Sequence, residues 1–503
     1  MEKKIRVRFA PSPTGGLHLG GVRTALFNYL FAKKHNGSFI LRIEDTDQTR
    51  FVEGAEEYIV NCLNWCGLTP DESPQNPGAF GPYRQSERKA SYKPYAEQLI
   101  ADGFAYYAFD TPEELNAKRA EQPNFLYGQQ TRMQMRNSLT LSKEEVANLI
   151  AQNTPYVVRI KMPENEQVSF LDMIRGLVSF DTNLVDDKVL LKADGMPTYH
   201  LAVVADDKAM EITHAFRGEE WLPSAPIHIL LWKYLGWEDE MPKWAHLPLI
   251  LKPDGHGKLS KRDGDRLGFP VYAMNWTDPK TGELTKGFKE LGFTPEAFVN
   301  LLAMLGWNDG TEKELFSLPE LIESFSIDRV SKAGAKFDFE KAKWYNHEWI
   351  KQTPAIDLAP IVAQLLAANH IQINENDLLT KVIDLVKDRC NLLDDFLTQS
   401  AYFFATPTKF DTDSVKPKWT AEKNNFFSAF SQSLTQDFTA SSLEENFKLL
   451  AESHGLKAGE LMLPFRVMLV GGKFGPGVFD IANLLGNKAV QERIEMACAE
   501  FNK

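Results

Sequence analysis

The sequence is poor in cysteine, in long apolar runs and in net positive charge, and each shortage excludes a class of protein. Its 503 residues include only 4 cysteines, too few for a disulfide framework, so we expect a reducing compartment. No uninterrupted apolar run approaches the length of a membrane span. The amino terminus MEKKIRVRFA enters a strand pattern without an apolar signal segment. We therefore expect a cytoplasmic protein with no membrane association.

The formal net charge of −12 argues against indiscriminate nucleic-acid binding, because a phosphate backbone would be repelled at long range. The segment KAGAKFDFEKAKW is nonetheless locally basic, and taken alone it is typical of a solvated helix face. Its lysines are Lys332, Lys336, Lys341 and Lys343. A hydrophobic share of 43% with 25% charged residues describes an ordinary globular protein, and the length favours roughly three or four domains.

The first informative stretch is FAPSPTGGLHLGGVRTALFNYL, which begins at Phe9. Before it, IRVRFA alternates apolar residues with Arg6 and Arg8, the period-2 pattern of a half-buried strand. After it, apolar residues recur at helical spacing, so a helix is expected to start near Gly20. FILRIED then reads as a second strand. Strand, loop, helix and strand in this order predict the opening of a parallel α/β sheet.

The loop between that strand and helix is a candidate nucleotide site. In parallel α/β sheets, ligands bind where strands end and helices begin, and the unpaired amides and positive dipole of a helix start attract anions. Gly20 and Gly21 lack side chains that would block a nucleotide, and His18 can donate to a phosphate. A turn that merely needs flexible residues is the alternative, and this loop alone does not decide between them.

Later segments extend the pattern along the chain. Polar, helix-rich sequence with short strands runs from 87 to 186, after which strands resume in KVLLKADGMPTYHLAVVADD and EITHAFRGEEW, with a turn at Asp194-Gly195. We therefore expect an α/β sheet built from residues 1–86 and 187–262 that an inserted domain interrupts. From about 270 the pattern is almost wholly helical.

A second loop, GKLSKRDG, follows an apolar strand and carries Lys258 and Lys261 around Ser260. Flexible lysines can follow a phosphate chain and neutralise charge that grows in a transition state. Phosphoryl and nucleotidyl transfer need little more than positioning and metal ions. Taken alone, such a loop is more often a charged surface loop. Its recurrence with the first loop, in this order, favours nucleotide chemistry.

Together these segments carry a family resemblance. PSPTGGLHLGG and KLSKR resemble the two signature motifs of class I aminoacyl-tRNA synthetases. RIEDTD, GPYRQSER, PTYHLA, RGEEWLPSAPIH and KFDFEKAKWYNHEW are similar to the bacterial glutamyl-tRNA synthetase family over essentially the whole chain. The resemblance implies an α/β, Rossmann-like catalytic domain (1–86 and 187–262) with an inserted α+β acceptor-end-binding domain (87–186). A helical stem-contact domain (263–335) and an all-helical anticodon-binding region (336–503) would follow.

The resemblance also implies roles for individual residues. The ATP-binding set is His18, Gly20, Gly21, Glu220, Lys258 and Lys261, of which His18, Lys258 and Lys261 would be catalytic. The amino-acid pocket is formed by Arg8, Ala10, Ser12, Glu44, Tyr199 and Arg217. Arg8 and Arg217 can each form bidentate bonds to a side-chain carboxylate, and Glu44 can pair with an α-ammonium. With this context, tRNA contact becomes the favoured role of Lys332, Lys336, Lys341 and Lys343.

The implied reaction is ATP-dependent ligation of L-glutamate to the 3′ end of tRNA(Glu) through a glutamyl-adenylate, with Mg²⁺ accompanying ATP and tRNA needed for activation. The family resemblance implies a monomer. Some relatives carry zinc in the inserted domain, but residues 88–190 contain neither cysteine nor histidine, so no zinc is expected. A glutaminyl-tRNA synthetase, whose anticodon part is built from β-barrels, and a non-tRNA nucleotidylyltransferase, which needs neither insert nor helical tail, are the alternatives.

Overall fold

The computed structural model describes residues 3–373, 375–434 and 438–503, and the chain forms two compact units. Unit 1 comprises residues 1–290 and 298–339, and unit 2 comprises residues 291–297 and 340–503. Within the described ranges, no helix combines the length and the apolar character needed to cross a membrane.

A six-stranded sheet is the centre of unit 1, with strand order β2-β1-β8-β9-β5-β6. Its strands are β1 (Arg6–Phe9), β2 (Ser38–Leu41), β5 (Gln167–Asp172), β6 (Gly176–Asp181), β8 (His214–Gly218) and β9 (Lys243–Leu247). Neighbours pair in parallel, except that β6 runs antiparallel to β5 at one edge. The predicted parallel α/β sheet is confirmed.

The helices of unit 1 connect and cover these strands. They are α1 (Leu19–Lys34), α2 (Ala55–Trp65), α3 (Lys89–Ala101), α4 (Pro112–Glu121), α5 (Lys143–Ala151), α6 (Tyr199–Ala209), α7 (Ala225–Tyr234), α8 (Lys261–Leu267), α9 (Pro295–Met304) and α10 (Leu318–Ser324). The first turn of α9 belongs to unit 2. Helix α1 begins one residue before the predicted start at Gly20, and it carries the chain from β1 to its parallel neighbour β2.

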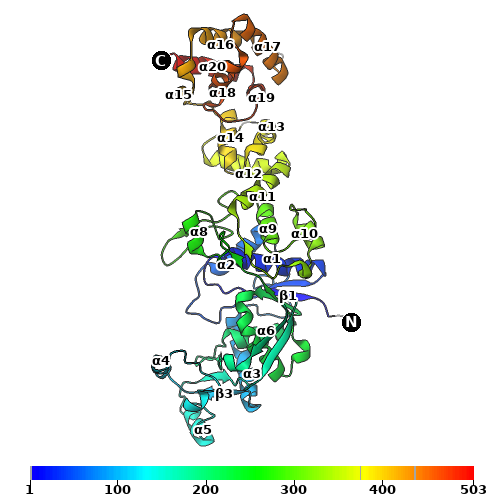
Figure 1. Ribbon diagram of the computed structural model, residues 1–503, viewed down its shortest axis with the longest axis vertical. Helices are drawn as coiled ribbons and strands as arrows, with labels where there is room; N and C mark the ends of the chain where they lie inside the picture. Colours follow the sequence, from blue (N-terminus) through cyan, green and yellow to red (C-terminus); the bar gives the residue numbers. More distant parts are fainter. Residues whose placement is uncertain (1–2, 374, 435–437) are drawn as a thin grey trace. The chain divides into compact units, whose positions relative to one another are not determined.

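Strand β1 is buried on both faces, so the prediction of a half-buried strand is wrong. On one face of the sheet, α1 covers β1 and its neighbour β8, where Phe31 of α1 packs against Phe216 of β8 with ring centroids 5.0 Å apart. On the other face Arg8 of β1 bonds to Asp207 of α6. Figure 1 shows α1 and α6 on opposite sides of β1. Arg6 and Arg8 are only 7% and 4% exposed, since helices cover both faces of a parallel sheet and each arginine pairs with a carboxylate.

Helix α6 replaces a strand that the sequence analysis expected in YHLAVVADD. Every residue from Leu201 to Asp207 is buried in α6, and a helix buried on all sides has the same continuous apolar run as a buried strand. The turn at Asp194-Gly195 is confirmed, because Gly195 has φ +78° and its N–H donates to the Lys192 carbonyl at 2.9 Å.

A separate antiparallel sheet contains β3 (Ala105–Ala108), β4 (Val157–Ile160) and β7 (Val189–Leu191), in the order β3-β4-β7. The division of strands between the two sheets therefore does not follow the boundary at residue 186, where the inserted segment was expected to end and the main sheet to resume. Strands β5 and β6 precede this boundary but belong to the main sheet, whereas β7 follows it and belongs to the small sheet. The pairing of β5 with β9 joins Asp172 to Trp244, a long-range contact that local patterns do not report.

The predicted helical segment 263–335 also contains short strands. Strands β11 (Trp276–Thr277) and β12 (Leu284–Thr285) form an antiparallel hairpin, and β10 (Ile250–Leu251) pairs in parallel with β13 (Ala335–Lys336). Hence the expectation of an almost wholly helical chain after residue 270 is wrong for this segment.

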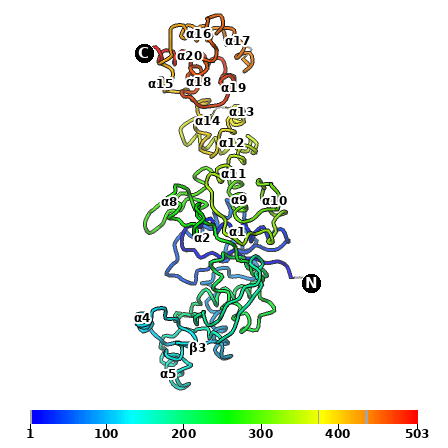
Figure 2. Tube along the Cα trace, in the orientation of Figure 1, coloured from blue at the N-terminus to red at the C-terminus, as the bar shows by residue number. Residues whose placement is uncertain are grey.

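The described residues of unit 2 form helices joined by turns and loops, with no strand among them (Figure 2). Its helices are α11 (Phe339–Gln352), α12 (Ala355–Ala368), α13 (Asn376–Val386), α14 (Asp395–Phe404), α15 (Thr412–Val415), α16 (Ala421–Ser433), α17 (Ala440–Ser453), α18 (Ala458–Val470), α19 (Val478–Leu485) and α20 (Asn487–Phe501). Helix α11 starts at the last residue of unit 1. The helical prediction for this region is confirmed.

Candidate active site

A cavity of about 1120 Å³ in unit 1 lies where β1 and β8 end and α1 begins. The residues predicted to bind ATP and the amino acid all line it: Arg8, Ala10, Ser12, His18, Gly20, Gly21, Glu44, Tyr199, Arg217, Glu220, Lys258 and Lys261. The two motif loops, more than 200 residues apart in the sequence, therefore share one cavity. This is the arrangement that a single nucleotide site requires.

His18 is the N-cap of α1 and presents a neutral donor to the cavity. Its Nδ1 accepts the Gly20 N–H at 3.3 Å, so the ring proton is on Nε2. Among the described residues, Nε2 is buried and has no hydrogen-bond partner. Burial and, next, Lys258 lower the pKa of His18 to about 4, partly opposed by Glu220. At neutral pH the ring is uncharged, and its Nε2–H is available to an anionic oxygen.

The two predicted loop glycines differ in what they permit. A Cβ on Gly20 would have only His18 Nδ1 near it, at 3.9 Å, so this position is open to close approach by a ligand. A Cβ on Gly21 would lie 2.6 Å from Leu17 Cδ1. A side chain at Gly21, in the first turn of α1, would therefore displace the end of the Leu17 side chain, which is a different reason for glycine from the predicted close approach of a nucleotide.

Both lysines of the second loop are held by carboxylates. Lys258 Nζ lies 2.6 Å from Glu220 Oε1, and Lys261 Nζ lies 3.3 Å from Glu283 Oε1 in the β11–β12 hairpin. Lys261 begins α8, whose N-cap Ser260 exchanges hydrogen bonds with Asp263. Because the ion pairs are partly exposed, phosphate oxygens can replace these carboxylates at little cost.

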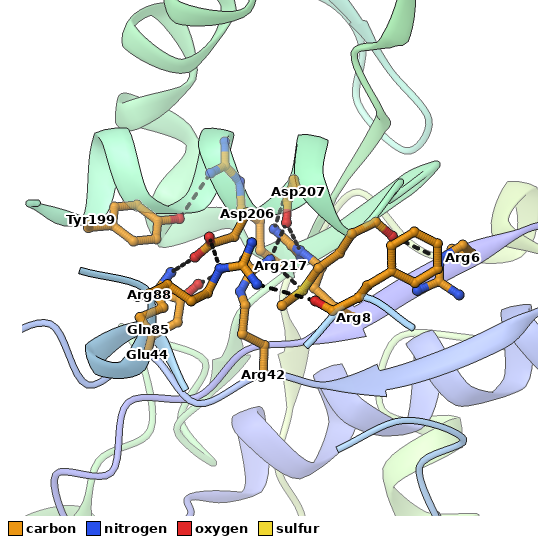
Figure 3. A network of polar contacts seen from close by, with 12 residues as sticks. Arg6, Arg8, Arg42, Glu44, Gln85, Arg88, Tyr199, Asp206, Asp207 and Arg217 are labelled. Carbon is orange, nitrogen blue, oxygen red and sulfur yellow. Dashed lines mark hydrogen bonds and ion pairs between the residues drawn. The ribbon is translucent and has the colours of Figure 1, made fainter. Parts of the chain in front are cut away.

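A second part of the cavity is built on a buried ion-pair network (Figure 3). Arg8 Nε and Nη2 donate to the two oxygens of Asp207 at 3.0 and 3.1 Å. The wholly buried Arg42 donates to Asp207 at 2.8 Å and to Glu44 at 3.1 Å. Burial raises the pKa of Asp207, but Arg8 and Arg42 outweigh it and lower this pKa below its usual value. Arg8 thus already directs two of its groups to a protein carboxylate rather than to a ligand.

Arg217 is held in a different way. Its Nε donates to His246 Nε2 at 2.9 Å, and its Nη1 donates to Tyr199 Oη at 3.1 Å and to His228 Nδ1 at 3.0 Å. Its guanidinium carbon lies 4.7 Å from the centre of the Trp244 ring. Nη2 is buried and, in the part of the chain that the structure describes, has no partner. Arg217 therefore offers the cavity a fixed, unpaired cationic donor.

The sequence analysis missed five residues of the networks around Arg8 and Arg217: Arg42, Asp172, Asp207, His228 and His246. A usable signal was present, since each lies in or beside an apolar stretch such as FILRIED or WAHLPLIL, where a buried polar group needs a partner. The identity of that partner depends on the fold and could not be read from the pattern.

The lysines predicted to contact tRNA do not line the cavity. Lys332 and Lys336 are exposed in unit 1. Lys341 and Lys343 lie on α11 within unit 2, where Lys341 Nζ is 4.1 Å from the centre of the Trp344 ring and Lys343 pairs with a glutamate of the preceding turn. Their predicted role in tRNA binding stays a prediction. Within residues 3–373, 375–434 and 438–503, no cluster of three or more histidine, cysteine or acidic side chains could hold a metal ion.

Comparison with known proteins agrees with this geometry. The family model described as "tRNA synthetases class I (E and Q), catalytic domain" matches residues 4–344. The chain belongs to this family of class I tRNA synthetases. A second model, "Anticodon binding domain", matches residues 355–498, so this family member combines an α/β catalytic domain with a helical anticodon-binding domain.

Relatives match this tRNA synthetase along its whole length. It is 51% identical over 500 residues to the glutamate–tRNA ligase of Porphyromonas gingivalis (strain ATCC 33277), covering 99% of this chain and 98% of the relative. It is 52% identical over 506 residues to that of Flavobacterium psychrophilum, covering 99% and 100%. A crystal structure of a glutamate tRNA ligase from Elizabethkingia meningosepticum, in complex with its amino acid, has a TM-score of 0.95 at 47% identity, with 99% of each chain covered.

Proposed function

We propose that this chain ligates L-glutamate to the 3′ end of tRNA(Glu) with ATP, through a glutamyl-adenylate intermediate. One observation carries the proposal: both motif loops line a single cavity, and each of its two parts has a buried donor that finds no hydrogen-bond partner among the described residues. His18 Nε2 serves the nucleotide, and Arg217 Nη2 serves the side-chain carboxylate of glutamate. Glutamine would leave Arg217 without a counter-charge.

In the first step, the α-carboxylate of glutamate attacks the α-phosphorus of ATP, and pyrophosphate leaves as the P–O bond to it breaks. No side-chain nucleophile is needed, because alignment and charge stabilisation lower the barrier. The Nε2–H of His18 donates to a phosphate oxygen, while Lys258 and Lys261 neutralise the charge that grows on pyrophosphate. Glu44 is placed to accept the α-ammonium, although one of its oxygens already accepts from Arg42.

Magnesium bound to the ATP phosphates would supply further neutralisation of their charge. The cavity contains oxygen donors that suit this ion, but they are engaged: Glu44 with Arg42, Asp45 with Ser86, and Glu220 with Lys258. The proposal therefore assigns no protein ligand to magnesium. It also includes action as a monomer in the cytoplasm, as the family resemblance implies.

In the second step, a ribose hydroxyl of the terminal adenosine attacks the carbonyl carbon of the adenylate, and AMP leaves. The insert around β3, β4 and β7 would hold the acceptor end of tRNA, and unit 2 would reach the anticodon. We assign the basic segment with Lys332, Lys336, Lys341 and Lys343 to the tRNA backbone, since phosphates are contacted by lysines.

ATP–pyrophosphate exchange tests this proposal. We expect exchange with glutamate only when tRNA is present, followed by charging of tRNA(Glu). Exchange with glutamine in preference to glutamate would favour a glutaminyl-tRNA synthetase. Pyrophosphate exchange supported by a small metabolite without any tRNA would favour a nucleotidylyltransferase. Charging of purified tRNA(Glu) and tRNA(Gln) side by side measures whether one or both are substrates.

A lysine variant tests the assigned chemistry. Lys261→Ala should slow adenylate formation about 100- to 1000-fold, the typical effect of losing one donor that stabilises transition-state charge. The KM for glutamate should stay unchanged, because Lys261 does not contact the amino-acid part of the cavity. Lys280→Ala removes an exposed lysine from the nearby β11–β12 hairpin and is the matched control. Unchanged turnover in Lys261→Ala would remove this lysine from the mechanism.

A further inference from the structure

A buried carboxylate lies behind Arg217, one imidazole ring away. Asp172, at the end of β5, accepts the His246 Nδ1–H at 2.6 Å and the His246 backbone N–H at 3.1 Å through one oxygen. Its other oxygen accepts the backbone N–H groups of Ile174 and Arg175, each at 2.9 Å. Asp172 is 2% exposed and His246 is wholly buried. Both oxygens of Asp172 are thus used to fix the turn after β5 and the ring of His246.

These bonds determine where the proton of His246 resides. A carboxylate accepts hydrogen bonds, so Nδ1 of His246 must carry the proton, and Nε2 must present its lone pair. That lone pair accepts the Nε–H of Arg217 at 2.9 Å. Burial lowers the pKa of His246, although its bond to Asp172 opposes this, and the ring is neutral at neutral pH. Asp172 therefore orients Arg217 through a neutral ring of defined tautomer.

A second histidine chain holds the other side of the guanidinium. His228 Nδ1 accepts from Arg217 Nη1 at 3.0 Å, which leaves the His228 proton on Nε2, 3.2 Å from Nδ1 of His200. Burial lowers the pKa of His228 well below its usual value and that of His200 to about 4. Both rings are neutral, so they orient Arg217 without adding charge.

In the described part of the chain, Arg217 lacks the carboxylate partner that Arg8 and Arg42 have. Arg8 and Arg42 contact the carboxylate of Asp207, whereas the partners that the described residues give to Arg217 are neutral rings and the Tyr199 hydroxyl. A buried guanidinium without a contacting counter-ion is costly, and a ligand carboxylate removes that cost through charge-assisted hydrogen bonds.

We infer that Asp172 and His246 are positioning residues for substrate selection: they fix Arg217 with Nη2 directed into the cavity and leave its charge to be neutralised by the side-chain carboxylate of the amino acid. This inference rests on the proposed function, because it explains how that site prefers a carboxylate over a neutral amide. Neither residue lines the cavity, so both act through Arg217.

Asp172→Asn is the direct test. If the amide oxygen keeps the Ile174 and Arg175 N–H groups, its NH₂ group faces His246 and the bond from the His246 backbone N–H is lost. The His246 ring then carries its proton on Nε2 and turns a donor toward the Arg217 Nε–H. Two facing donors repel, so Arg217 shifts. We expect the KM for glutamate to rise about 10- to 100-fold, the size of effect known for the outer partners of metal ligands, and the preference over glutamine to fall. The KM for ATP should stay unchanged, which a general loss of folding would not allow.

The matched control is Asp181→Asn on the same β5–β6 hairpin. Asp181 accepts the Asn183 backbone N–H at 2.9 Å, and in the described part of the chain no hydrogen bond joins it to Arg217 or its histidines. It should keep the wild-type KM for glutamate. Thermal melting of both variants reports whether the hairpin still folds.

A pair of His246 variants keeps the test decisive if Asp172→Asn does not fold. Glutamine offers one donor and one acceptor at a spacing similar to that of the two ring nitrogens, so His246→Gln should retain part of the preference for glutamate that His246→Leu loses. A folded Asp172→Asn protein with wild-type KM for glutamate, or an equal rise in both KM values, would overturn the inference. A wild-type protein that does not charge tRNA(Glu) would instead overturn the proposed function.

Discussion

Both units have an apolar core, but the interior of unit 1 also contains a network of buried ion pairs. The sheet of unit 1 buries charged side chains beside its apolar core, including Arg6, Arg8, Arg42, Asp206, Asp207 and Arg217. Unit 2 buries a cluster of aromatic rings, including Phe426, Phe427, Phe430, Phe447, Phe465 and Phe479. Among the described residues, the buried Arg493 donates to the backbone carbonyls of Leu469 and Tyr402 rather than to a carboxylate.

This difference indicates that the interior of unit 1 positions charged substrates, whereas the interior of unit 2 mainly stabilises its helices. Buried ion pairs contribute little net stability compared with apolar packing, because desolvation offsets their attraction. Unit 1 nevertheless places Arg8, Arg42 and Asp207 directly under the cavity, where fixed charges position a charged amino acid. Unit 2 has an apolar interior, which stabilises helices whose exposed faces remain available to a partner. Perturbing each interior should therefore have different consequences for activity.

The largest expected effect comes from Asp207→Asn in unit 1. The variant leaves Arg8 and Arg42 buried without their shared counter-charge, so the free energy of unfolding should fall by about 3–5 kcal/mol. Glutamate binding should weaken as well, because Arg42 also orients Glu44. Urea unfolding and the KM for glutamate measure the two effects. Glu97→Gln on the exposed face of α3 is the control and should change stability by less than about 0.5 kcal/mol.

The pH dependence of unfolding sharpens this prediction. Because Arg8 and Arg42 lower the folded pKa of Asp207, its contribution to stability is fully present above the unfolded pKa of about 3.9 and is lost as pH falls through the lower folded pKa. Wild-type protein should lose stability in this acidic range more steeply than Asp207→Asn. Parallel curves for the two proteins would contradict the assigned ion pair.

A smaller effect, restricted to stability, is expected from Leu443→Ala in unit 2. Leu443 is 3% exposed in α17, and its truncation should lower the free energy of unfolding by about 2–5 kcal/mol through lost burial and a cavity. Leu449→Ala on the same helix is the matched control, since Leu449 is 61% exposed. Adenylate formation by folded protein should keep its KM for glutamate in both variants. A changed KM for glutamate in Leu443→Ala would contradict the prediction that the interior of unit 2 affects stability alone.

Local sequence patterns predicted the strands and helices that have a clear hydrophobic period. They also predicted the site residues that lie in a recognisable motif. The strand before His18, the helix after it and the shared cavity with Lys258 were accessible because glycines and lysines in a loop point to a nucleotide. Helix α6 was not accessible, since its buried apolar run has no period that distinguishes it from a strand. Asp172 was hidden for another reason: its partner His246, which in turn contacts Arg217, lies on a strand that pairs with β5 only in the folded sheet.

The smallest effect is expected at the ATP part of the site, from Glu283→Ala. Lys261 and Glu283 are 34% and 63% exposed, so their ion pair contributes at most about 1 kcal/mol. Its removal leaves Lys261 available to phosphates and should lower the KM for ATP by no more than about fivefold, without changing the KM for glutamate. Glu312→Ala removes the same charge from another exposed position of unit 1 and should leave both values unchanged. A raised KM for ATP would show that Glu283 assists nucleotide binding. The contrast with Asp207 has a physical reason. In the amino-acid part, Arg8 and Arg42 must stay in place, so they are held by the buried carboxylate of Asp207. In the ATP part, Lys261 must exchange the carboxylate of Glu283 for a phosphate, so their ion pair is exposed and weak.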